Sequence, residues 1–118
     1  MTAPEALIQT ALLGEAVDAG PALVFVADED MRYIAVNEFA CRTLGYTRDE
    51  LLELRVSEIA QEAAAPSEYD ELLVNGSRHG TSILTRKDGS TVEFDYQATK
   101  TRVAGLHLFV SIGFLADS

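Results

Sequence analysis

The sequence predicts an α+β domain with five strands, in which short helices stand between the first two strands and the last three. Two short β-like runs stand near the N-terminus, at residues 23–27 and 32–36. Helix-capping signals occupy the middle of the chain, and from Gly80 onward apolar and polar residues alternate with a period of two. The chain has 118 residues, 47% of them hydrophobic, which suits one domain with its own core.

The first segment predicts a helix that ends at Gly20-Pro21. Thr2 and Glu5 have the spacing of a capping box, and Pro4 suits a first turn. The apolar stripe of this helix consists of Leu7, Ile8, Ala11, Leu12 and Val17. We expect the stripe to cover one face of the sheet, because it is the only obvious cover for that side.

The first two strands predict a hairpin. The apolar run Leu23–Ala27 is bounded by the acidic turn 28–30, and the second run, Arg32–Val36, follows at once. In the first strand, Phe25 and Ala27 lie on one face while Val24 and Val26 lie on the other, so both faces need cover. This pattern favours a position in the middle of the sheet.

Short helices follow the hairpin. Asn37 is a good N-cap for a helix that Gly45 ends, and Thr47 with Glu50 repeats the capping-box spacing for another helix through Leu54. Residues 56–66 are predicted to be irregular. A last helix, at 68–74, ends at Asn75-Gly76.

Three strands are predicted at residues 81–86, 91–100 and 106–115, joined by turns at Lys87–Ser90 and near Ala104-Gly105. The middle strand has one apolar face, made of Val92, Phe94, Tyr96 and Ala98. The last strand is apolar on both faces, so we expect it beside the first strand at the centre of the sheet.

Composition limits the partners and the compartment. A formal charge of −10 disfavours nucleic acid and anionic membrane surfaces. Cys41 is the single cysteine, which excludes an internal disulfide and favours a reducing, cytoplasmic setting. The longest uncharged stretch, Val103–Ala116, is shorter than the ~18 apolar residues that a membrane span needs. We therefore expect no membrane association of this chain.

Two stretches of the sequence resemble a PAS domain, namely LVFVADEDMRYIAVNEFACRTLGYTRDELL and TRKDGSTVEFDYQA, followed by a closing strand at 106–114. The resemblance implies an antiparallel sheet of five strands in the order 2-1-5-4-3, with short helices on one face and an N-terminal flanking helix on the other. It also implies two parts, a flanking helix at 1–20 and the PAS domain at 21–116. The chain departs from the pattern at 114–118, where many PAS domains carry an Asp-Ile-Thr-like signature.

Cofactor and enzyme chemistry are not expected. In the flavin-binding LOV subgroup of PAS domains, the adduct cysteine lies in a phrase whose counterpart here, near Leu54–Ile59, has no cysteine. The usual haem histidine of PAS proteins has no counterpart at 68–74, although His107 could face the pocket. The two histidines and the carboxylates do not form a catalytic or metal-binding pattern. We expect neither flavin, haem nor metal, and no enzyme activity.

The resemblance implies a pocket between the sheet and the helices, with apolar walls and a few polar anchors, as small-molecule sites have. We expect a ligand with one polar end, such as a fatty or aromatic acid. The alternative is a core packed solid by Phe94, Phe109 and Tyr69. The predicted lining residues are Phe25, Ala27, Ala40, Thr43, Leu44, Tyr69, Leu73, Ser82, Leu84, Phe94, Tyr96, Phe109, Ser111 and Gly113.

The resemblance and the exposed apolar surface together predict a homodimer, because monomers rarely expose large apolar patches. The expected interface consists of Leu7, Ile8, Leu12, Leu13 and Val17 on the helix with Val110 and Ile112 on the sheet. The expected function is that of a sensory domain from a bacterial signalling protein. Such a protein could be a histidine kinase of a two-component system, a cyclic-dinucleotide enzyme or a transcription regulator. The alternative function is a ligand-free dimerisation or interaction module.

Overall fold

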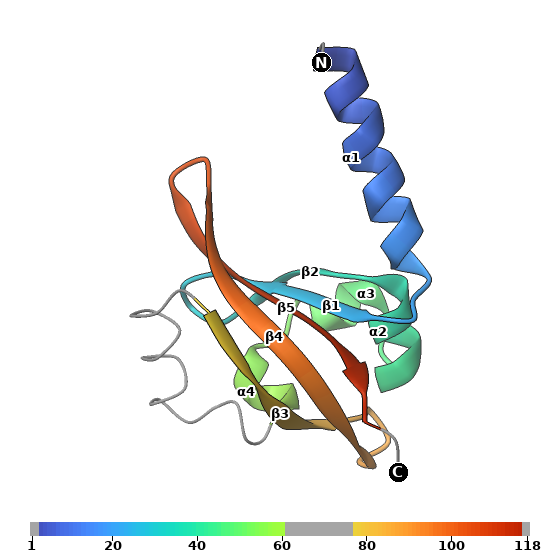
Figure 1. The fold of residues 1–118 in the computed structure, drawn as a ribbon. Helices are drawn as coiled ribbons and strands as arrows, with labels where there is room; N and C mark the ends of the chain where they lie inside the picture. Colours follow the sequence, from blue (N-terminus) through green and yellow to red (C-terminus); the bar gives the residue numbers. More distant parts are fainter. Residues whose placement is uncertain (1–2, 61–76, 117–118) are drawn as a thin grey trace.

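The computed structural model of the chain describes residues 3–60 and 77–116, and its centre is one antiparallel sheet (Figure 1). The strands lie in the order β2-β1-β5-β4-β3, which confirms the predicted fold. The strands are β1 (Leu23–Ala27), β2 (Tyr33–Val36), β3 (Ser77–Thr85), β4 (Thr91–Val103) and β5 (Leu106–Leu115). The helices are α1 (Ala3–Asp18), α2 (Glu38–Leu44), α3 (Arg48–Leu51) and α4 (Val56–Ile59).

Strands β1 and β5 lie side by side inside the sheet, as their apolar patterns predict. They pair antiparallel, with Phe25 opposite Ser111. The inner face of the sheet is the one that carries the buried side chains Leu23, Phe25, Phe94, Tyr96 and Phe109. The outer face carries the alternate residues, which are more exposed.

The β4–β5 connection is a tight turn at Ala104-Gly105. Both residues have positive φ, 52° and 83°, as a type I′ turn requires. This turn matches the twist of the strands and holds a long ladder in register, from Val103–Leu106 at the tip to Phe94–Leu115. Strands β3 and β4 extend beyond their predicted bounds: β3 begins at Ser77 and β4 continues to Val103.

Asn37 joins the helical layer to the sheet. As the predicted N-cap of α2, its Oδ1 accepts from Ala40 N at 3.1 Å, and it also accepts from Val24 N at 3.1 Å. Its Nδ2 donates to Val17 O at 2.7 Å and to Ala22 O at 2.8 Å. One buried amide therefore satisfies backbone groups of α1, β1 and α2 at once.

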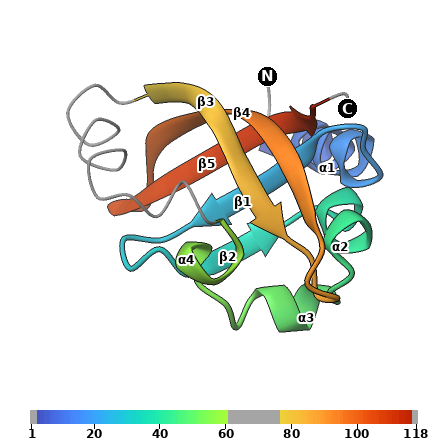
Figure 2. The same cartoon turned by 90° about the horizontal axis from the view of Figure 1, so that it is seen from below.

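Helices α2, α3 and α4 lie over the inner face (Figure 2). The capping box of Thr47 and Glu50 is present, but α3 ends at Leu51 instead of continuing through Leu54. The prediction of an irregular stretch from residue 56 is wrong at its start, because α4 forms there. This single turn is stabilised by a hydrogen bond from Arg55 N to the Glu58 carboxylate, 2.7 Å long. The helix predicted at 68–74 lies outside the described residues.

Helix α1 does not cover the outer face of the sheet, contrary to the prediction; it extends away from the sheet (Figure 1). Ile8, Leu12 and Leu13 are 59%, 58% and 69% exposed. The direction of α1 follows from how its C-terminal end is held. Asp18 accepts from Glu38 N at 2.8 Å and from Arg48 Nη2 at 3.0 Å, which fixes this end beside α2 at the margin of the sheet.

Candidate functional site

Aromatic side chains fill the middle of the inner face. The Phe25 ring lies 5.5 Å from the Tyr33 ring and 5.6 Å from the Phe94 ring, centroid to centroid. Phe94 stacks on Tyr96 at 5.5 Å. Such pairs stabilise a core beyond the area they bury. These four rings form one connected aromatic cluster on the inner face.

The structure brings most of the predicted lining residues to this face. Thr43 and Ser111 are half-buried, whereas Tyr69 and Leu73 lie outside the described residues. The buried members of the predicted set are Phe25, Ala27, Ala40, Leu44, Ser82, Leu84, Phe94, Tyr96, Phe109 and Gly113.

Gly113, one of the predicted lining residues, does not open space for a ligand. A Cβ at this position would collide with the carbonyl oxygen of Asp95 and would lie 2.6 Å from Tyr96 Cα. The glycine is instead required for the close approach of the β4 backbone to β5.

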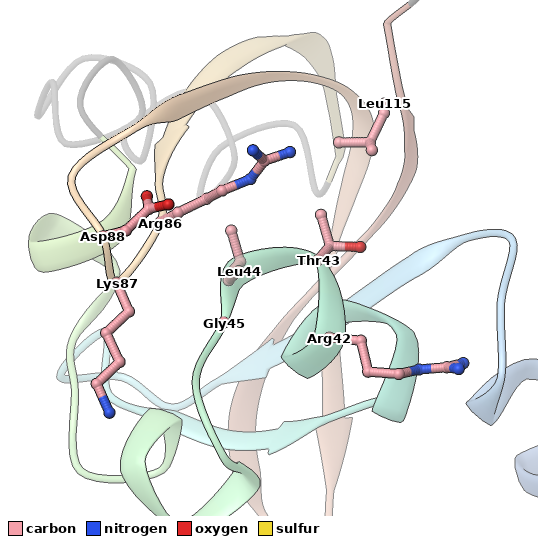
Figure 3. Close-up of a pocket in the computed structure, with 8 residues that line it drawn as sticks. All are labelled: Arg42, Thr43, Leu44, Gly45, Arg86, Lys87, Asp88 and Leu115. Carbon is pink, nitrogen blue, oxygen red and sulfur yellow. The ribbon is translucent and has the colours of Figure 1, made fainter.

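A cavity of about 570 Å³ lies at one margin of the inner face, between the C-terminal end of α2 and the turn that joins β3 to β4 (Figure 3). This volume is in the usual range for small-molecule sites. Thr43 and Leu44 were predicted to line a pocket, and they do line this cavity. The remaining walls are Arg42, Gly45, Arg86, Lys87, Asp88 and Leu115.

The two walls of the cavity are tied together by main-chain hydrogen bonds. Gly45 ends α2 in the left-handed region, with φ of 80°, and its N–H donates to Cys41 O at 2.9 Å. Lys87 N donates to Leu44 O at 2.9 Å, which attaches the β3–β4 turn to the end of the helix. The shape of the cavity is therefore set by backbone that is already bonded.

Two charged groups of the turn have local partners. Lys87 Nζ lies 2.6 Å from the Glu50 carboxylate and 5.9 Å from the centroid of the Tyr46 ring. The hydrogen bond from Lys87, with a further one from Thr47 N, lowers the pKa of Glu50. Asp88 accepts from Ser90 Oγ at 2.6 Å and from Ser90 N at 2.9 Å, and these bonds lower the pKa of Asp88.

Three buried polar side-chain atoms of the described residues have no hydrogen-bond partner: Ser82 Oγ, Arg86 Nε and His107 Nδ1. Ser82 and Arg86 are four residues apart, so alternation along β3, continued one residue past its end, places both on the inner face of the sheet. Figure 3 shows the Arg86 guanidinium directed into the cavity, between Leu44 and Leu115. The predicted lining residues did not include Arg86. The alternation of Ser82 and Leu84 along the strand could have identified this arginine from the sequence.

Other functional groups contribute little to the site. Burial raises the pKa of the Cys41 thiol, which keeps it protonated and unreactive. No group of three potential metal ligands occurs within residues 3–60 and 77–116. In the same two segments, no helix is both long and apolar enough to cross a bilayer.

The described side chains among the predicted interface residues are exposed or half-buried in this chain. On α1, Val17 is exposed along with Ile8, Leu12 and Leu13, and the side chain of Leu7 lies outside the described part. On the outer face of the sheet, Ile112 is exposed and Val110 is half-buried.

The sheet order, the helices over one face and the cavity at their margin define a small α+β domain with a helical cover on one side. The PAS domain family matches residues 21–117, and the chain belongs to this family. Members of the family are in general sensory modules without catalytic activity of their own. No curated protein matches the chain.

Solved PAS structures share the fold at low sequence identity. A PAS domain from a two-component sensor histidine kinase has a TM-score of 0.84 at 13% identity, over 94% of this chain and 99% of that chain. The PAS domain of an HTR-like protein from Haloarcula marismortui has a TM-score of 0.82 at 22% identity, over 96% of each chain. An RNA-binding Light-Oxygen-Voltage receptor has a TM-score of 0.71 at 20% identity, over 94% of this chain and 33% of that chain.

Proposed function

We propose that this chain is the sensory domain of a cytoplasmic bacterial signalling protein, and that it binds a small, largely apolar ligand between its sheet and its helices. The observation that supports ligand binding is Ser82 Oγ, a buried hydroxyl without a partner on an otherwise apolar face. An unsatisfied buried polar group costs about 1–3 kcal/mol, and native proteins contain few of them. The polar end of a fatty or aromatic acid would supply the missing partner.

The signal would leave the domain through a homodimer. Helix α1 exposes a row of apolar side chains, and the outer face of the sheet exposes Ile112 and Phe114 at 47% and 56%. A second copy would cover both surfaces, and a ligand would act by its differential affinity for two arrangements of the dimer. A net charge of −10 argues against a nucleic-acid partner. We propose no flavin and no haem, because the sequence lacks the usual cysteine and histidine for them.

A second candidate is a ligand-free dimerisation module, which the aromatic cluster of Phe25, Phe94 and Tyr96 favours because these rings already fill the centre of the face. The two candidate functions differ in whether a small molecule is bound between the sheet and the helices. Only the sensory domain carries a small molecule in its resting or stimulated state.

Native mass spectrometry of the purified chain tests the choice, followed by extraction of any bound molecule. We expect a small-molecule adduct that Ser111→Phe abolishes, because the ring would enter the inner side beside Phe25. Val110→Phe is the matched control, since this neighbour on the same strand points to the outer face; it should keep the adduct. If neither the parent chain nor Ser111→Phe ever carries an adduct, and Ser111→Phe melts at a much lower temperature than the parent, the core is packed solid and the chain is a ligand-free module.

A further inference from the structure

We propose that Arg86 binds the carboxylate of a small organic acid in the cavity between α2 and the β3–β4 turn, with the apolar part of the acid against Leu115. The inference goes beyond the proposed inner-face site, because it names a second place on the chain, and a residue there, that would bind an acid. That place is the cavity at the margin, since aromatic rings occupy the middle of the inner face.

The first argument is the state of the Arg86 side chain. A guanidinium remains charged at any ordinary pH and presents only donors. Here its Nε is buried without a partner, and among the described residues the side chain forms no ion pair. Burying a guanidinium N–H without a hydrogen-bond partner is unfavourable, and a carboxylate beside Nε and Nη would remove that cost by a bidentate pair.

The second argument is the charge that remains available in the cavity. Its walls carry three cations, Arg42, Arg86 and Lys87, and one carboxylate, Asp88. Glu50 pairs with Lys87, and Asp88 lies close enough to Arg86 for the arginine to lower its pKa, so the walls offer no more than one uncompensated positive charge. One positive charge suits a monoanion such as a carboxylate and gives poor compensation for a phosphate dianion.

The directions of the side chains single out Arg86 among the cations. Arg42 donates from Nη2 to Ala19 O at 3.2 Å, and in Figure 3 its guanidinium points away from the cavity, as does Lys87. The Asp88 carboxylate already accepts two hydrogen bonds from Ser90. Arg86 is near enough to Asp88 to lower the pKa of this carboxyl, but among the described residues the two side chains form no ion pair.

The apolar walls explain why the acid needs a hydrocarbon part. Leu115 is half-buried and lines the cavity beside the Arg86 guanidinium, whereas Leu44 has no exposed surface and belongs to the opposite wall. A short aliphatic chain or a single aromatic ring would contact the Leu115 side chain while its carboxylate meets the guanidinium. Inorganic anions would lack this contact.

Two matched pairs of probes test the proposal: octanoate with 1-octanol, and phenylacetate with 2-phenylethanol. Binding to the full chain is measured by calorimetry and by ¹H–¹⁵N shifts of Gly45, Lys87 and Asp88. In the parent protein, we expect a carboxylate to bind about tenfold or more tightly than its alcohol. Arg86→Gln should weaken the binding of the carboxylate by about tenfold or more and change the affinity for the alcohol by less than twofold. Arg86→Lys keeps the charge but loses the planar set of N–H donors, so it should give an intermediate loss of carboxylate affinity.

Arg102→Gln is the matched control, because this exposed arginine lies near the β4–β5 hairpin tip, away from the cavity. It should change neither affinity by more than twofold. Arg86→Gln should not lower the melting temperature, since the residue has no partner to lose; a marked loss would indicate a structural role and overturn the inference. So would the absence of amide shifts with both acids at millimolar concentration, or an unchanged affinity in Arg86→Gln.

These outcomes are separable from the test of the proposed function. An adduct in native mass spectrometry, with no effect of Arg86→Gln on the acids, leaves the sensory domain in place and removes only the assignment of Arg86. Binding of octanoate or phenylacetate through Arg86, without any adduct on the inner side, keeps the acid site and removes the inner-face pocket.

Discussion

Replacing Asn37 by alanine should destabilise the domain more than any other single change of a polar side chain at a helix end. The side chain makes four hydrogen bonds with the main chain, to Val17, Ala22, Val24 and Ala40. At about 1 kcal/mol net for each, the loss is about 4 kcal/mol, well above the 0.5–2 kcal/mol of an ordinary N-cap. For a domain whose free energy of unfolding is about 5–15 kcal/mol, this is a large fraction.

The assay is urea denaturation of the parent, Asn37→Ala and Asn37→Asp. The aspartate keeps the acceptor for Val24 N and Ala40 N but loses the two donors, so we expect about half of the alanine effect. Thr47→Ala is the control, because it removes the exposed N-cap of α3 and should cost about 1 kcal/mol. If Asn37→Ala costs no more than Thr47→Ala, the four bonds do not stabilise the junction between α1, β1 and α2, and the argument is refuted.

Four further predictions concern the dimer, the surface ion pair, the thiol and the colour of the protein. In sedimentation at high micromolar concentration the parent should be a dimer and Leu12→Glu a monomer, with Gln9→Glu on the same helix as control; a monomeric parent would contradict the interface. Glu50 has a lowered pKa in the folded state, so its contribution to stability is present above the ordinary value of 4.5 and is lost as the pH falls through the lower folded value. Glu50→Gln should remove that part of the acid dependence in pH-dependent melts, and an unchanged slope would exclude it. Cys41 should react with iodoacetamide only at the rate of unfolding, because it is buried and its pKa is raised; alkylation as fast as in urea would disprove this. The purified protein should show no Soret band and no structured absorption in the blue, and either feature would establish a bound haem or flavin.

The local features of the fold could be read from the sequence because each depends on neighbouring residues. Asn37 and Gly45 bound α2 as N-cap and left-handed C-cap, since a short side chain that accepts hydrogen bonds and a residue without Cβ suit these positions. The alternation along residues 91–100 predicted which side chains of β4 are buried. Two-sided apolar patterns predicted that the first and last strands pair inside the sheet, and they do, although the outer face of these strands stays exposed in this chain. The single turn of α4 was missed, since four residues do not establish a helical period.

Other features depend on groups that are distant in sequence, and only the tertiary structure decided them. The direction of α1 is set by Asp18 bonded to Glu38 and Arg48, contacts that no pattern within residues 3–18 contains. Gly113 is small because the β4 backbone lies against it, and not because a ligand needs the space. The cavity beside Arg86 exists where the end of one helix meets a turn more than forty residues away, so its walls and its uncompensated charge arise only when the two segments come together. Short-range preferences determine caps, turns and faces, whereas directions, close approaches and cavities are determined by the packing of elements against one another.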